Sequence, residues 1–120
     1  MPRGLAIALL MLLIADGARA DETRFRLING TSYPIRGLSL SPHDIGAWGP
    51  NVLRPPPIQP GELREVVFQS DFRDCNQDLK VVFTDQDSQP VWGYLNLCGL
   101  RKIRLRYDAT SGITTAAYED

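Results

Sequence analysis

Proline and glycine interrupt the chain at short intervals, and this limits the length of any regular element it can form. Together they account for 19 of the 120 residues. Beyond residue 23, no ten-residue stretch shows the periodicity of an amphipathic helix. Several of the intervening stretches alternate apolar and polar residues, which is typical of strands with one buried face. We therefore expect an all-β fold, a small antiparallel β-sandwich or open barrel of about 6–7 short strands, rather than a parallel sheet with crossover helices.

The expected strands are short and lie between turn signals. They are Arg24–Ile28, Tyr33–Leu40, Leu63–Gln69, Asp78–Thr84, Pro90–Cys98 and Lys102–Tyr107, with a weak seventh at Gly112–Ala117. In the sixth strand, Lys102, Arg104 and Arg106 share the face opposite to the apolar residues. Such basic residues either protect an edge strand from pairing with another chain or bind an anionic glycan or phosphate. We expect the first role.

Four segments have the composition of turns or loops. Asn29-Gly30 is a tight-turn signal because both residues tolerate positive φ. Pro60-Gly61 is typical of a type II turn. Arg54–Pro60 contains four prolines and is expected to be an extended loop, since proline donates no ladder hydrogen bond. Asp44–Leu53 has room for one turn of 3₁₀- or α-helix.

The first 20 residues differ from the rest and have the parts of a secretory signal peptide. Arg3 gives a positive start, Leu5–Ala15 is an apolar run, and Ala18-Arg19-Ala20 is a small-residue cleavage site. The apolar run is shorter than the roughly 20 residues of a membrane-spanning helix, so we expect no membrane span. We expect cleavage after Ala20, a single β domain at 21–120, and a periplasmic or secreted location.

Cys75 and Cys98 are the two cysteines of the chain, and export to an oxidising compartment favours a bond between them. If Asp78–Thr84 and Pro90–Cys98 form a hairpin across Asp85–Ser88, the numbers of opposed residues sum to 173, and the two cysteines meet this condition. The spacing lacks the C-x-x-C arrangement of redox-active pairs. The bond is expected to contribute about 3 kcal/mol to stability.

The same register opposes Val81 with Trp92 and Leu79 with Tyr94, which places aromatic and aliphatic groups on one face. A β-bulge near Gly93 would shift this register without necessarily preventing the disulfide.

The segment Ser39–Leu53 concentrates the unusual residues, including the single histidine and one of two tryptophans. One interpretation is structural: Ser41 or Asp44 caps a short turn, and Trp48 and Leu53 plug an open end of the sandwich. The other is an exposed loop in which Trp48 anchors a partner. The candidate partner-binding residues of this segment are His43, Asp44, Trp48 and Asn51.

Several classes of site are disfavoured by composition. The formal net charge is −1 and no basic run is present, which argues against nucleic acid and an anionic membrane surface as partners. One histidine and two bonded cysteines cannot fill a zinc site, and Asp85–Ser88 lacks the EF-hand pattern. Asp71, Asp74 and Asp78 are expected to mark a loop that leads into a strand. We expect no cofactor, no metal and a monomer.

Five motifs occur in order along the chain. They are Phe25-x-Leu27-x-Asn29-x-Thr31, Ile35-x-x-Leu38-x-x-Ser41-Pro42, Trp48-Gly49-x-Asn51-x-Leu53, Cys75-x-x-Asp78-Leu79-x-Val81-Val82-Phe83-x-Asp85 and Trp92-x-x-x-Asn96-Leu97-Cys98. Together they resemble a group of small exported proteins of Gram-negative bacteria, whose members usually have no assigned activity. The resemblance implies export, a disulfide and a single β domain, and it carries over no catalytic residue.

No nucleophile signature accompanies His43, so we expect no catalytic residue. The leading hypothesis is a non-enzymatic binding or structural module that recognises a protein or envelope component through the Trp48 loop. One alternative is a small envelope hydrolase or ligand carrier that uses His43 and Asp44. Another is an inhibitor of an exogenous hydrolase, with the proline-rich loop as its tip.

Overall fold

The structure is a computed structural model that describes residues 22–69 and 74–119. The expected signal peptide at 1–20 and the expected loop residue Asp71 lie outside the described residues. All regular elements of the described part are strands. They are β1 (Glu22–Asn29), β2 (Ile35–Pro42), β3 (Leu63–Gln69), β4 (Asn76–Phe83), β5 (Val91–Asn96), β6 (Lys102–Asp108) and β7 (Ile113–Glu119). Within these ranges, no helix is long and apolar enough to cross a membrane.

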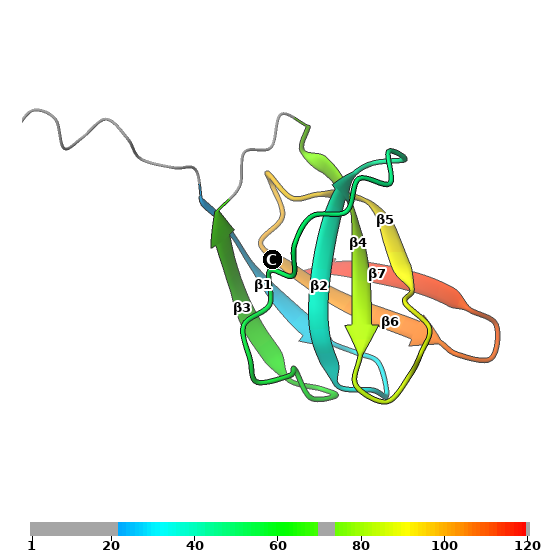
Figure 1. Cartoon of the computed structure of the whole chain (residues 1–120). Helices are drawn as coiled ribbons and strands as arrows, with labels where there is room; N and C mark the ends of the chain where they lie inside the picture. The colour runs from blue at the N-terminus through cyan, green and yellow to red at the C-terminus, as the bar shows by residue number, and fades with distance from the viewer. Residues whose placement is uncertain (1–21, 70–73, 120) are drawn as a thin grey trace, which may run out of the picture.

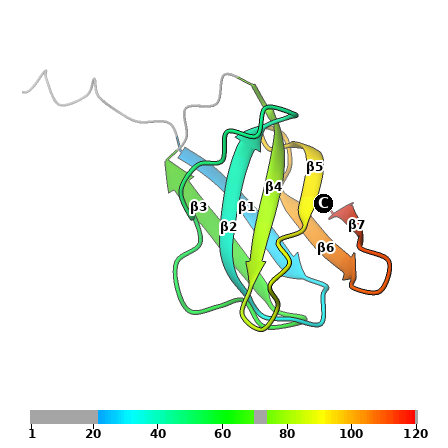
Figure 2. The same ribbon diagram turned by 45° about the vertical axis from the view of Figure 1, so that its right-hand side comes forward.

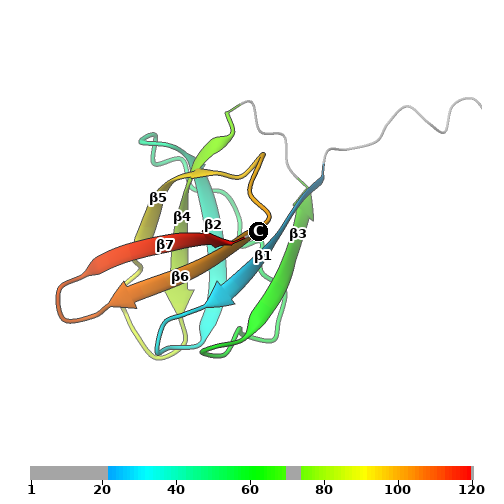
Figure 3. The ribbon, with the colours of Figure 1, turned by 180° about the vertical axis from the view of Figure 1, so that it is seen from behind.

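The strands form two sheets, which confirms the expected all-β sandwich. The four-stranded sheet has the order β3-β1-β6-β7, and the three-stranded sheet has the order β2-β4-β5. Figures 1 and 2 show the three-stranded sheet in front of the four-stranded one, and Figure 3 shows the latter from behind. One pair, β1 and β6, is parallel. This pair needs no crossover helix because the chain between the two strands forms β2 to β5, which are divided between the two sheets.

The core lies between the sheets because alternate strand residues point inward. Trp92 is the largest fully buried side chain, and its indole nitrogen donates to the carbonyls of Thr115 at 2.7 Å and Arg106 at 3.2 Å. It thus ties β5 to the opposite sheet. The buried apolar residues are Phe25, Leu27, Ile28, Ile35, Leu38, Leu40, Leu53, Ile58, Val66, Leu79, Val81, Phe83, Trp92, Leu95, Leu97, Ile103 and Leu105.

The two expected turns have different outcomes. At Pro60-Gly61, Gly61 has φ 82° and the Glu62 amide donates to the Gln59 carbonyl, which confirms the type II turn. After Asn29-Gly30 the chain bends, and the Thr31 amide donates to the side-chain oxygen of Asn29, but neither Asn29 nor Gly30 has the positive φ on which the prediction was based. Instead, the fully buried Asn29 side chain donates to the carbonyls of Tyr33 and Ile58, and the Gly30 amide donates to Leu105 of β6.

The long connection between β2 and β3 covers the outer edge of β2 (Figures 1 and 2). The expected helical turn in Asp44–Leu53 is absent from these described residues. The amides of Gly49 and Val52 donate instead to the carbonyls of Leu40 and Leu38, so the segment follows the strand edge. Further along, Ile58 forms an isolated bridge with Ile35 and is fully buried. The proline-rich segment is a loop, as expected, but it is not extended throughout, since the chain bends at Pro55 and Pro56.

The hairpin of β4 and β5 contains the disulfide Cys75–Cys98, with a Cα–Cα distance of 5.3 Å. The predicted bond is therefore confirmed, but the predicted register is wrong. Leu79 lies opposite Trp92, whereas Gln77 lies opposite Leu95. Between these pairs, Asp78 of β4 opposes two residues of β5, Gly93 and Tyr94, so the strand contains the β-bulge considered near Gly93.

Two further expectations about strand position are corrected by the topology. Strand β6 is not an edge strand, because it lies between β1 and β7. Protection of a sheet edge therefore cannot explain its basic residues. Asp78 does not mark a loop but lies inside β4, where its residue is only 9% exposed. Asp74 precedes the strand and is exposed, which fits the expected loop.

Candidate functional site

The buried carboxylate of Asp78 organises the end of the molecule where β2 ends and β4 begins. One of its oxygens accepts hydrogen bonds from Nδ1 of His43 at 2.7 Å and from the Tyr94 amide at 3.0 Å. Its other oxygen accepts from the Asp44 amide at 3.1 Å. Asp78 thus holds together the turn that follows β2 and the bulge of β5.

The two residues whose amides bind Asp78 both have unusual backbone conformations. Asp44 has φ 63° and Tyr94 has φ 61°, and they are the non-glycine residues with positive φ in the described part of the chain. Such conformations cost of order 1–3 kcal/mol each and persist when the surroundings enforce them. The hydrogen bonds to Asp78 supply that constraint. Strain of this kind clusters at functional sites, so it directs attention to this end of the molecule.

His43 lies between two carboxylates. Its Nδ1 binds Asp78, and its Nε2 is 3.3 Å from a carboxylate oxygen of Asp44. The hydrogen bond to Asp78 raises the pKa of His43 above the ordinary 6.5, against the effect of burial and with support from the charges of Asp44, Asp78 and Asp74. This arrangement favours an imidazolium that links the turn after β2 to β4.

The pKa of Asp78 lies below the ordinary 3.8. Burial raises this pKa, but the hydrogen bonds from His43 and from the amides of Asp44 and Tyr94 outweigh burial. Both shifts favour the ionised pair, since each charge stabilises the charged form of its partner.

The bulge turns the ring of Tyr94 outward, where the residue is 60% exposed. The ring meets that of His43 edge to face, with centroids 4.4 Å apart. Tyr94 also lines a groove of about 630 Å³ beside the ends of β5 and β7. The groove is lined by Asn76, Tyr94, Asn96, Gly99, Leu100, Arg101, Tyr118 and Glu119.

The other two sequence candidates make their contacts elsewhere. Trp48 is half-buried on the outside of the three-stranded sheet, where the ammonium of Lys80 lies 4.7 Å from its ring centroid. Of the two residues expected to plug an open end of the sandwich, Leu53 belongs to the buried core and Trp48 does not. Asn51 is exposed, and its side-chain oxygen Oδ1 accepts hydrogen bonds from the backbone amides of Leu38 and Leu53 at 2.9 Å each.

The structure therefore brings His43 and Asp44 together and adds Asp78 and Tyr94, which sequence reasoning did not select. A carboxylate within an alternating strand is a signal for Asp78, because a buried charge needs a partner. The chain has a single histidine to supply one. Tyr94 carries no comparable signal, since its exposure depends on the bulge.

The chemistry available at this cluster is limited. Nε2 of His43 and the Asp44 carboxylate can each offer one ligand to a metal ion, and the ligand atoms of His43, Asp44 and Asp78 lie within 4.8 Å of one another. However, the oxygens of Asp78 already accept three hydrogen bonds. In the described part of the chain, both His43 nitrogens face carboxylates rather than a hydroxyl group, so the dyad activates no nucleophile there.

Comparisons with protein families, with curated proteins and with solved structures found no match to this chain.

Proposed function

We propose that this protein is an exported, non-enzymatic binding module of the cell envelope. The observation that carries the proposal is the exposed Tyr94 ring beside a groove. The backbone of Tyr94 has a strained conformation, and its hydrogen bond to Asp78 holds it there. Pre-ordering a contact residue reduces the entropy lost on binding. The disulfide is compatible with an oxidising compartment, and the N-terminal sequence supports export.

The groove residues favour a hydroxyl-rich ligand such as an envelope glycan. Tyr94 and Tyr118 are 60% and 57% exposed and supply apolar ring faces, while Asn76 and Asn96 supply amide donors and acceptors. Aromatic surface with a few placed polar groups is the usual composition of a ligand site. The proposed recognition surface is thus centred on Tyr94, whose ring contacts His43 of the loop expected from the sequence.

The alternatives have less support. The hydrolase hypothesis lacks a nucleophile at His43 within the described residues. The inhibitor hypothesis needs a protruding proline-rich loop, but the guanidinium of Arg64 donates to the carbonyls of Arg54, Pro56 and Pro57. These bonds hold the loop against β3.

The proposal is tested by cosedimentation of the purified, oxidised protein with insoluble peptidoglycan. Tyr94→Ala and Tyr118→Ala are each expected to weaken binding about tenfold, as for the loss of an aromatic anchor. Ile113→Ala is the matched control because Ile113 is 60% exposed but does not line the groove.

The use of two tyrosine variants keeps the test informative if one variant folds poorly. The proposal fails if the parent protein does not sediment with the glycan. It also fails if both tyrosine variants bind as tightly as the parent.

A further inference from the structure

The outer face of the four-stranded sheet carries a concentration of positive charge. Alternation along β1 and β6 turns Arg24, Arg26, Lys102, Arg104 and Arg106 outward, because the residues between them are buried. With Arg101 just before β6, they make six of the chain's 13 lysines and arginines. The whole chain has a net charge of −1, so this concentration is local.

Part of this charge is balanced by neighbouring carboxylates. Arg24 forms ion pairs with Glu22 at 3.1 Å and with Glu65 at 2.9 Å. Glu119 of β7 binds Arg104 at 3.1 Å and approaches Lys102 at 3.9 Å.

Arg26, Arg101 and Arg106 form no ion pair among residues 22–69 and 74–119. Furthermore, Arg26 lies directly opposite Lys102 in the parallel pair of β1 and β6. Like charges in this position destabilise a sheet. Since β6 is an interior strand, edge protection does not explain the arrangement either.

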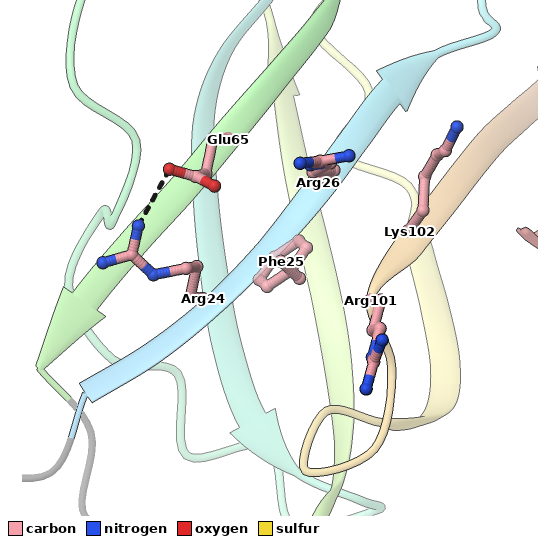
Figure 4. Close-up of a pocket in the computed structure, with 6 residues that line it drawn as sticks. All are labelled: Arg24, Phe25, Arg26, Glu65, Arg101 and Lys102. Carbon is pink, nitrogen blue, oxygen red and sulfur yellow. Dashed lines mark hydrogen bonds and ion pairs between the residues drawn. The ribbon is translucent and has the colours of Figure 1, made fainter. Parts of the chain in front are cut away.

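Arg26 and Arg101 line a depression of about 310 Å³, which we call the basic pocket. It is lined by Arg24, Phe25, Arg26, Glu65, Arg101 and Lys102. Figure 4 shows that the one acidic group of the lining, Glu65, is directed to Arg24, while Arg26 lies on β1 and Arg101 and Lys102 lie on the neighbouring chain segment, with the side chains of these last two extending in opposite directions. Glu65 thus neutralises Arg24, and Lys102 is 3.9 Å from Glu119, which leaves Arg26 and Arg101 without an ion pair among the described residues.

We propose that the basic pocket binds a phosphate group. Arg26 and Arg101, the two cations of its lining without an ion pair among the described residues, carry planar guanidinium groups that match phosphate oxygens in paired hydrogen bonds. A bound phosphate also offsets the electrostatic repulsion between Arg26 and Lys102, which folding places opposite each other. This site is independent of the Tyr94 groove, although Arg101 lines both and makes them neighbours.

The test measures binding of the purified, oxidised protein to inorganic pyrophosphate by calorimetry, and to phosphatidylcholine vesicles with or without phosphatidylglycerol by flotation. Arg26→Gln is expected to weaken binding about tenfold. Arg54→Gln removes the same charge from the exposed proline-rich loop and is expected to change affinity by less than about twofold.

Pyrophosphate binding that Arg26→Gln weakens and Arg54→Gln leaves nearly unchanged supports a site for soluble phosphates. Binding only to vesicles that contain phosphatidylglycerol, with the same pattern, supports a site for lipid headgroups. The proposal is overturned if neither probe binds, or if Arg54→Gln weakens binding as much as Arg26→Gln. The urea midpoint of Arg26→Gln should equal or exceed that of the parent, because one member of a like-charged pair is removed.

Discussion

At the scale of single residues, Asp78 has the widest effect because one carboxylate fixes two strained residues and a histidine. Its side chain is buried beside the bulge, and three donors converge on it. Without this acceptor, the left-handed conformations of Asp44 and Tyr94 lose the hydrogen bonds that offset their strain. The exposed position of Tyr94 therefore depends on a residue that a ligand in the groove need not contact.

Replacement of Asp78 should measure this dependence. We expect Asp78→Ala to lower the free energy of unfolding by about 2–4 kcal/mol, since it leaves buried donors without an acceptor. Urea denaturation at neutral pH provides the measurement. The control is Asp87→Ala in the exposed β4–β5 loop, expected to change stability by less than about 0.5 kcal/mol. Equal effects of the two changes would contradict the structural role of Asp78.

The hydrogen-bonded pair of His43 and Asp78 also predicts how the stability of the protein depends on pH. The raised pKa of His43 adds stability that is complete below 6.5 and is lost as pH rises through the pKa in the folded protein. The lowered pKa of Asp78 adds stability that is complete above 3.8 and is lost as pH falls through its folded pKa. For this pair, both contributions are complete between 3.8 and 6.5.

Urea midpoints measured across pH should therefore decline on both sides of this window. In His43→Gln the decline on the alkaline side should disappear, because glutamine does not titrate. An unchanged alkaline decline in this variant would assign the effect to another group.

At the scale of elements, the sequence patterns predicted all seven strands, since strand positions follow from alternation and turn residues. They did not predict the register of β4 and β5, because a bulge moves one residue out of the ladder without changing the alternation pattern nearby. The cysteines were paired correctly even so, since a disulfide tolerates a shift of one position. Tyr94 was missed for the same reason: its outward direction is a property of the bulge.

The conformation of the β2–β3 connection also could not be predicted from local sequence patterns. The segment Asp44–Leu53 has room for a helical turn, but its amides donate to the edge of β2, a contact that depends on tertiary structure. Asn51 shows how this edge is closed, because its side-chain oxygen takes the place of a neighbouring strand's carbonyl for Leu38. Asn51 thus has a structural explanation in addition to its predicted role in partner binding.

We expect Asn51→Ala to lower the free energy of unfolding by about 1 kcal/mol, because two amides lose an exposed acceptor. Asn51→Asp is the matched variant, since it keeps the accepting oxygen and should retain most of the stability. Chemical denaturation and limited proteolysis of the β2–β3 connection measure the two effects. If alanine and aspartate are equally destabilising, the oxygen at this position is not what closes the edge.

At the scale of the whole molecule, the two proposed sites lie next to one another but depend on different features. The groove depends on the bulge and on Asp78, and the basic pocket depends on the parallel pairing of β1 with β6. Arg101 lines both sites and belongs to the connection between β5 and β6. Cys98 lies in the same connection and bonds it to the start of β4.

The disulfide should therefore affect both stability and binding. Cys75 and Cys98 are separated by 23 positions, and closing a loop of this size contributes about 3 kcal/mol in the chain-entropy treatment. We expect the Cys75→Ser/Cys98→Ser variant to lose about this much stability in urea denaturation, and the reduced parent protein should match it. Without the disulfide, the β5–β6 connection that contains Arg101 is no longer bonded to the start of β4. We therefore expect the folded variant, measured without urea, to bind pyrophosphate more weakly than the parent. A variant with parental stability would show that the core alone holds this end together, and parental affinity in a destabilised variant would show that the strands position Arg101 without the bond.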